Sequence, residues 1–192
     1  KGETGFDYDK VHNLLTVTDA EGNTTAFVYD DLNRRISVTN AEAETTAFQY
    51  DPMGNRTRLT QADGTVTMYG FDAVYRLNRV TQNHQEGVEP NNDTNTLTQY
   101  AYDARGLLTR ITDANGSVTA FDYNAAGRMI RETNPLGDTW AYTYDGVGNR
   151  ITRRDANGAL TEYAYYPDNL LEEIRYADGT SVGYTYDPNN NR

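Results

Sequence analysis

The chain contains no cysteine, which excludes a disulfide framework and a thiolate metal site but leaves an extracellular location open. Lysine occurs only at positions 1 and 10, and neither lysine follows a glycine-rich turn, so a phosphate-cradling loop is missing. No apolar run approaches the ~20 residues that span a bilayer. Because the sequence opens with Lys1-Gly2-Glu3 rather than with Met and a hydrophobic stretch, we expect it to be a piece of a longer protein.

Apolar residues and positive charge are both scarce. Only 37% of the 192 residues are hydrophobic, which is low for a compact single core. The net charge is -11 and the isoelectric point is near 4.5. Nucleic acids and anionic membrane surfaces are recognised through Lys and Arg, so this balance argues against a nucleic-acid partner and against a membrane-surface role. Because no apolar run is long enough to span a bilayer, we also expect no membrane insertion.

An aromatic residue followed by Asp, or by a near substitute, recurs along the whole chain. These anchors are Tyr8, Tyr29, Tyr50, Phe71, Tyr102, Tyr123, Tyr144, Tyr165 and Tyr186. Successive anchors are 21 residues apart, except that Phe71 and Tyr102 are separated by 31. A fixed period is the sequence signature of a repeat architecture. We predict a single repeat array over residues 1–192, with an inserted hairpin loop at residues 83–95.

A second aromatic residue stands two positions before every anchor. The resulting pairs are Phe6 and Tyr8, Phe27 and Tyr29, Phe48 and Tyr50, Tyr69 and Phe71, Tyr100 and Tyr102, Phe121 and Tyr123, Tyr142 and Tyr144, Tyr163 and Tyr165, and Tyr184 and Tyr186. A spacing of two places both rings of a pair on one face of a strand. We call these residues the aromatic ladder and predict that they form the core of the array.

Glycine dominates the position seven residues before each later anchor. The turn glycines are Gly22, Gly64, Gly116, Gly137, Gly158 and Gly179. They commonly follow Asp-Ala-Glu or Asp-Ala-Asn, a pattern that predicts a hairpin turn with a positive φ. Ala43 occupies the same column, where it should cost about 1 kcal/mol if the geometry is kept.

Each repeat therefore reads as a strand, a hairpin turn, a second strand and a connecting turn. No segment has a convincing helical period, and the Gly, Asn and Thr content disfavours helix. A two-stranded hairpin is marginal alone, so neighbouring units must stabilise one another. The predicted fold class is all-β: an array of 21-residue β-hairpin repeats that forms a spiralling, curved antiparallel sheet.

The repeat unit resembles that of the RHS or YD-repeat family, which reads approximately Tyr-Asp-x-x-Gly-Arg-Leu before its first strand. The resemblance covers essentially the whole chain and is carried best by Tyr50-Asp51-Pro52-Met53-Gly54-Asn55-Arg56, Tyr102-Asp103-Ala104-Arg105-Gly106-Leu107-Leu108, Tyr123-Asn124-Ala125-Ala126-Gly127-Arg128-Met129 and Tyr144-Asp145-Gly146-Val147-Gly148-Asn149-Arg150. The departures are local: Phe71 replaces Tyr, Asn124 and Tyr166 replace Asp, and Tyr75 replaces Gly.

This resemblance implies a hollow β-shell. Proteins of the family include bacterial polymorphic toxins, toxin-complex subunits, wall-associated proteins and teneurin-like adhesion proteins, and in the bacterial toxins the shell encloses a C-terminal toxin domain. About 17 strands at roughly 4.8 Å make a sheet close to 80 Å wide, whereas enclosing a small domain takes about 125 Å. We therefore expect this chain to be less than one turn of a partial RHS/YD shell.

The sequence offers little for enzymatic chemistry. The two histidines, His12 and His84, lie in no nucleophile or zinc pattern, so we predict no catalytic residue, no metal site and no cofactor. His12 falls in a turn column. The Asp residues after the anchors fit Asx-turn bonds to backbone better than catalytic pairs. Asp51-Pro52 and Asp187-Pro188 contain only the dipeptide of the family's self-cleavage segment, so this piece does not encode self-cleavage.

The insertion at 83–95 is acidic and rich in oxygen ligands. A calcium site is conceivable there, although the EF-hand spacing is absent. We expect a mobile, solvated loop at one rim of the sheet, with a ligand site or a partner contact as the alternative.

These observations favour a non-enzymatic structural segment that contributes to an encapsulating shell in a secreted or contact-delivered bacterial toxin used in bacterial competition. The expected partners are flanking repeats of the parent protein and an enclosed C-terminal toxin domain, with self-association through open sheet edges as a further expectation. The alternative is an adhesive or carbohydrate-binding module at the cell surface, whose tyrosines would bind a glycan. Buried ladder rings would favour the shell, whereas a groove of exposed rings would favour the glycan.

Overall fold

A computed structural model describes residues 2–91 and 93–191 of the chain. All the regular structure among these residues is β-strand, which confirms the predicted all-β class. No helix of the described part has the length and apolar character needed to cross a membrane. The chain divides into two compact units, Lys1–Gln99 and Tyr100–Arg192, each of them built from the same hairpin repeats.

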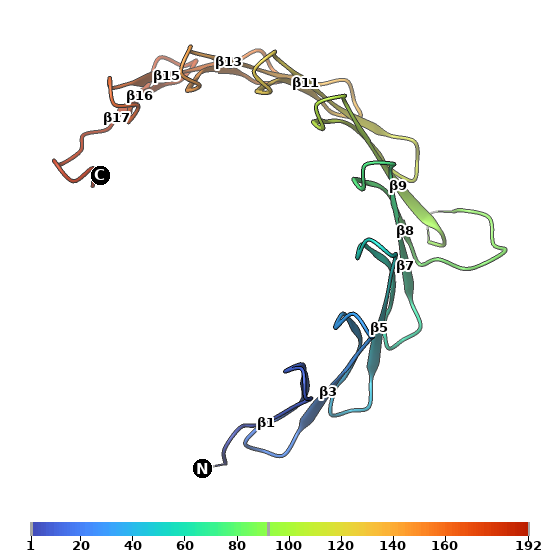
Figure 1. Cartoon of the computed structure of the whole chain (residues 1–192). Helices are drawn as coiled ribbons and strands as arrows, with labels where there is room; N and C mark the ends of the chain where they lie inside the picture. The colour runs from blue at the N-terminus through green and yellow to red at the C-terminus, as the bar shows by residue number, and fades with distance from the viewer. Residues whose placement is uncertain (1, 92, 192) are drawn as a thin grey trace. The chain divides into compact units, whose positions relative to one another are not determined.

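The first unit contains eight strands and the start of a ninth. They are β1 (Gly5–Tyr8), β2 (Leu14–Thr18), β3 (Thr24–Tyr29), β4 (Arg35–Thr39), β5 (Thr45–Tyr50), β6 (Arg56–Thr60), β7 (Val66–Phe71), β8 (Leu77–Gln82) and β9 (Thr96–Tyr102). Each strand pairs antiparallel with the next one along the chain. The unit is therefore a meander of hairpins, and its strands lie in a single layer (Figure 1).

The second unit repeats this plan. Its strands are β10 (Leu108–Thr112), β11 (Val118–Tyr123), β12 (Met129–Thr133), β13 (Thr139–Tyr144), β14 (Arg150–Arg154), β15 (Leu160–Tyr165), β16 (Leu171–Arg175) and β17 (Ser181–Gly183). Sequential neighbours again pair antiparallel from β10 to β17.

Both kinds of turn use the same backbone geometry. In the turn after β3, the N–H of Asn33 donates to the carbonyl of Asp30, and the N–H of Asp30 donates to the carbonyl of Arg34. In the turn after β2, Gly22 and Asp19 make the corresponding bonds. This is a three-residue hairpin loop in which a left-handed residue follows a type I turn. Because neighbouring strands run in opposite directions, the anchor turns gather at one end of the strands and the glycine turns gather at the other.

A β-bulge lies opposite the anchor in these hairpins, on the strand that follows it. Val28 of β3 faces Ser37 and Tyr29 faces Arg35, so the register shifts there and leaves Ile36 of β4 as the extra residue. The same shift recurs at Tyr8, Tyr50, Phe71, Tyr123, Tyr144 and Tyr165. A bulge increases the local twist of a strand pair, so each repeat adds twist at an equivalent position.

Candidate functional site: the contacts that join successive repeats

The aromatic ladder lies on a largely open sheet face. Phe6 and Tyr8 are 54% and 56% exposed, and the other ladder rings are half-buried. Val66 is the single buried apolar residue among those that the structure describes. The ladder is thus a line of half-covered rings, and the sheet has no second layer among the described residues to bury it further.

Arginine side chains stack between ladder rings of neighbouring repeats. The guanidinium carbon of Arg35 lies 5.7 Å from the centre of the Phe27 ring and 5.5 Å from that of Phe48. Arg56 lies 5.8 Å from the Phe48 ring and 5.0 Å from the Tyr69 ring. Phe48 therefore contacts two guanidinium groups, and cations at these distances attract the ring electrostatically.

The same arrangement occurs in the second unit, where Arg150 lies 5.8 Å from the Tyr142 ring and 4.8 Å from the Tyr163 ring. These arginines stand six residues after an anchor. The same column elsewhere holds Leu14, Leu77, Leu108, Met129 and Leu171. This column is not among the aromatic and glycine columns singled out above, although its restriction to Arg, Leu and Met is a signal for long side chains that fill the space between rings.

The anchor tyrosines join the two strands of a repeat through their hydroxyl groups. The O–H of Tyr50 donates to the carbonyl of Arg35 at 2.8 Å, on the preceding strand. Tyr123, Tyr144, Tyr165 and Tyr186 make the same bond to Leu108, Met129, Arg150 and Leu171. Burial raises the pKa of Tyr123 and of Tyr165, and in Tyr123 the nearby Asp103 charge adds to the effect, so these phenols remain protonated donors.

The Asp that follows an anchor closes its turn. One carboxylate oxygen of Asp51 accepts the N–H groups of Met53 and Asn55 at 2.9 and 2.8 Å, and the other accepts the side-chain amide of Asn55. Asp30 binds Leu32 and Arg34 in the same way and forms an ion pair with Arg34. Hydrogen bonds from Asn55 lower the pKa of Asp51, and those from Arg34 lower the pKa of Asp30. These carboxylates therefore act as turn acceptors.

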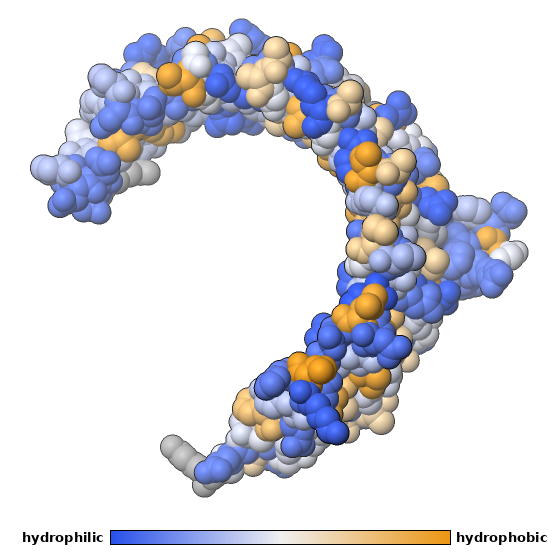
Figure 2. All heavy atoms as spheres, viewed as in Figure 1, coloured by the Kyte–Doolittle hydropathy of each residue, from blue (hydrophilic) through white to orange (hydrophobic). Residues whose placement is uncertain are grey.

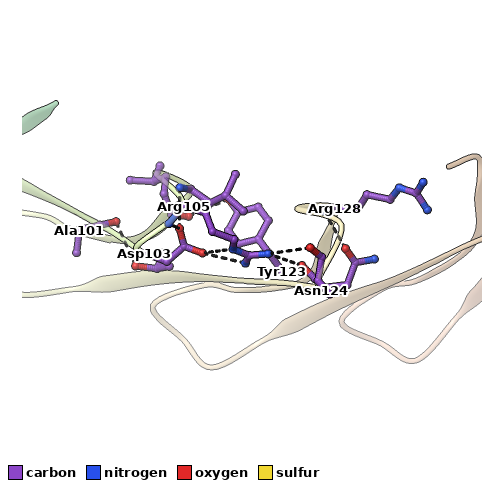
Figure 3. A network of polar contacts seen from close by, with 10 residues as sticks. Ala101, Asp103, Arg105, Tyr123, Asn124 and Arg128 are labelled. Atoms are coloured by element: carbon purple, nitrogen blue, oxygen red, sulfur yellow. Dashed lines mark hydrogen bonds and ion pairs between the residues drawn. The ribbon is translucent and has the colours of Figure 1, made fainter. Parts of the chain in front are cut away.

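Side chains at one anchor turn also reach the next turn. Arg34 donates to the carbonyl of Asp51 at 2.8 Å, and Arg128 donates to that of Asp145 at 2.9 Å. Figure 3 shows a variant of this link, in which Arg105 pairs with Asp103 at 2.8 Å and donates to the carbonyl of Asn124 at 2.7 Å. Shorter side chains bridge as well, for example Asn13 to Asn33. The turns consequently form a second line of contacts alongside the aromatic ladder.

The turn glycines all have a positive φ, between 78° and 89°. Ala43 shares the column and has a φ of 63°. In the anchor-turn column His12 and Tyr75 have φ values of 69° and 63°, which makes Tyr75 an unusual left-handed aromatic residue. The turn geometry is thus imposed even where the residue disfavours it.

The described residues contain no group of three or more His, Cys, Asp and Glu that could hold a metal ion. His12 lies exposed in an anchor turn, whereas His84 lies in the insertion, far along the chain from it. The anchor Asp residues are each engaged in their own turn rather than paired with one another. The site that this geometry defines is a set of inter-repeat contacts.

Comparison with known families identifies the class of protein. The family model described as the RHS repeat matches residues 8–45, 36–66, 92–118, 102–139 and 123–160. These segments make up more than half of the chain, and the chain therefore belongs to the RHS repeat family. No curated protein matched the chain.

Solved structures of toxin complexes have a similar fold. A crystal structure of TcdB2-TccC3 matches with a TM-score of 0.76 at 20% sequence identity, covering 97% of this chain and 11% of that chain. A crystal structure of TcdB2-TccC3-TEV gives 0.75 at 20% identity over 99% of this chain and 11% of that chain. A Tc holotoxin pore from Photorhabdus luminescens gives 0.64 at 15% identity, covering 90% and 12%. The chain thus spans about a ninth of the length of these proteins.

Proposed function

We propose that this chain is a non-enzymatic structural segment of an RHS-repeat protein, and that it forms part of a β-shell around a C-terminal toxin domain. The parent protein would be a secreted or contact-delivered bacterial toxin. The membership of the RHS repeat family and the fold that the chain shares with toxin-complex proteins support this proposal. Flanking repeats of the parent would continue the wall on both sides.

The observation that carries the proposal is that one set of contacts, within and between repeats, recurs along the array. The anchor tyrosines, the turn carboxylates and the stacked arginines are engaged in contacts that hold strands together. A β-sheet wall needs such contacts at every repeat, whereas an active site needs one particular set of side chains at a single place in the molecule. The repetition of one contact set therefore favours a structural role.

The carbohydrate-binding alternative receives less support from the ring geometry. Sugars stack on the faces of aromatic rings, and the faces of Phe48, Tyr69 and Tyr163 are approached by guanidinium groups of this chain. Phe6 and Tyr8 are the ladder rings with the largest exposure. A glycan that stacked on these three rings would therefore have to displace arginines that lie between neighbouring rings.

Purification of the parent protein tests the proposal. The native protein is passed over a size-exclusion column, and the eluted peak is compared with the bands and masses obtained under denaturing conditions. Protease is then added to the native peak and to a denatured sample. We expect the C-terminal polypeptide to resist digestion in the native peak and to be digested after denaturation. A C-terminal region that is digested at once in the native protein would contradict enclosure.

A matched pair of variants makes this test specific. Arg56→Ala removes a guanidinium that lies between two rings, whereas Arg110→Ala removes one whose bond goes to Thr112 on its own strand. In a shell, the first change should speed digestion of the C-terminal region and the second should leave it nearly unchanged. Equal rates for both variants would show that the inter-repeat stack does not maintain the wall.

A further inference from the structure

The insertion is closed on itself by the side chain of Asn95 and is joined to the sheet by the backbone of His84. Asn95 is 6% exposed and buried beneath the loop. Its side-chain amide donates to the carbonyls of Gln85 and Val88, and its oxygen accepts the N–H of Gln85 at 2.9 Å. The N–H of His84 also donates to the carbonyl of Val66 on β7. Between β8 and β9 this loop extends beyond the neighbouring turns, and its visible surface is largely hydrophilic (Figures 1 and 2).

A cavity of about 350 Å³ lies between this loop and the strands beneath it. Met68 and Leu97 contribute apolar surface from β7 and β9, and Val88 contributes it from the loop. Arg79, His84 and Glu86 add a cation, an imidazole and a carboxylate to the same lining. A mainly apolar cavity with a few polar groups and a volume above about 300 Å³ has the character of a small-molecule site.

Arg79 differs from the arginines at the same repeat position. Arg58 and Arg110 each donate to a threonine two residues later, and Arg131 forms an ion pair with Asp122. Arg79 has no hydrogen-bond or ion-pair partner among the residues that the structure describes. Its guanidinium therefore lines the cavity as a cation available to an anion.

The hydrogen bonds of Asn95 define which nitrogen of His84 is available. Because the Asn95 amide nitrogen donates to two carbonyls, its oxygen must be the atom that lies 2.8 Å from Nδ1 of His84. That oxygen can only accept, so a neutral His84 carries its proton on Nδ1. Nε2 is then an acceptor, and together with the Glu86 carboxylate it provides two acceptors in the lining.

We infer that this cavity binds a free amino acid with an apolar side chain. The carboxylate of the ligand would pair with Arg79, its ammonium group would donate to Glu86 and to Nε2 of His84, and its side chain would contact Met68, Val88 and Leu97. A zwitterion matches the one cation and the one anion in the lining, whereas a simple anion would pair with Arg79 and be repelled by the like charge of Glu86. This site does not depend on the enclosure of a toxin.

Calorimetric titration of the chain tests the inference with L-leucine, L-methionine and L-valine as probes. We expect saturable binding of at least one of them, with glycine at least about tenfold weaker because it lacks the apolar group. Leucine methyl ester, which lacks the carboxylate, and 4-methylpentanoate, which lacks the ammonium group, should each bind about tenfold or more weakly than leucine. No saturable binding by any of the three amino acids would overturn the inference, and so would equal binding of the ester.

Two variants distinguish a specific role of Arg79 in binding from a general effect of removing a positive charge from the sheet. Arg79→Gln should weaken binding about tenfold or more, because a charge-assisted bond is lost. Arg110→Gln changes the same repeat position away from the insertion and should leave the affinity unchanged. A urea unfolding curve for each variant checks that the fold is intact. If a folded Arg79→Gln variant binds as tightly as the parent chain, the inference is wrong.

Discussion

Single residues in the turns carry a conformational cost that the rest of the repeat imposes on them. Ala43 and Tyr75 have a positive φ because the hydrogen bonds around them close the same three-residue loop as in the glycine-containing turns. Non-glycine residues are disfavoured in this region by contact of Cβ with the backbone. The hydrogen bonds that close each turn thus determine the conformation at these positions.

Replacing Ala43 by Gly should therefore stabilise the chain by about 0.5–1 kcal/mol. The reverse change, Gly64→Ala, should destabilise it by a similar amount. A Cβ added at Gly64 meets no atom within 4 Å, so the cost comes from the φ of 85° alone. The free energy of unfolding in urea measures both effects. The account fails at this position if Ala43→Gly leaves the unfolding midpoint where it was.

The arginine between two rings gives a second prediction. Arg56→Ala removes the group that contacts Phe48 and Tyr69 and should cost about 1 kcal/mol of stability. Arg56→Leu should cost less, because leucine occupies the equivalent position in other repeats, as at Leu77 and Leu108. Urea unfolding again provides the measurement. Equal losses for the two variants would mean that filling the space between rings contributes nothing.

At the scale of the element, the anchor turn depends on an ionised Asp. The pKa of Asp51 is lower in the folded chain than its ordinary value of about 4, since hydrogen bonds to Asn55 and to backbone N–H groups favour the charged form. A group with a lowered folded pKa contributes stability above its unfolded pKa. That contribution is lost as the pH falls through the folded pKa.

We therefore expect the unfolding midpoint to fall as the pH is lowered below about 4. Asp51→Asn should remove part of this dependence and keep the turn, because Asn124 accepts the N–H of Arg128 at the equivalent position. Asp31→Asn is the matched control, since the Asp31 carboxylate makes no hydrogen bond among the described residues. A pH profile that Asp51→Asn leaves unchanged would count against the turn carboxylate as the source.

The order of strands and turns could be predicted from the sequence. The period of 21 residues and the columns of turn glycines persist even where single residues depart from the repeat. The bulge opposite each anchor could not be predicted, since nothing in the sequence distinguishes Ile36 from a residue of a regular strand. The stacking of Arg35 between two rings could not be predicted either, because an exposed arginine in a strand can contact many different neighbouring side chains. The conformation of the insertion could not be predicted either, because it depends on the hydrogen bonds of Asn95 and no sequence motif indicates them.

At the scale of the whole molecule, the sheet ends in strands with free edges. β1 is exposed at all four positions and pairs with β2 alone among the described residues, and the three residues of β17 pair in the same way with β16. Exposed edges template pairing with another chain. We expect the isolated chain to self-associate with rising concentration in light scattering, and Phe6→Lys to weaken this. A monomer at every concentration would contradict the expectation.

The central claim is that these repeats form part of a closed wall around a C-terminal domain. An electron cryo-microscopy map of the parent protein tests it most directly. The account predicts that residues 5–183 lie as consecutive strands in a continuous β-wall, with additional density inside it that belongs to the C-terminal polypeptide. An open sheet or fibre with the C-terminal domain outside would contradict the claim and would favour an adhesive surface module.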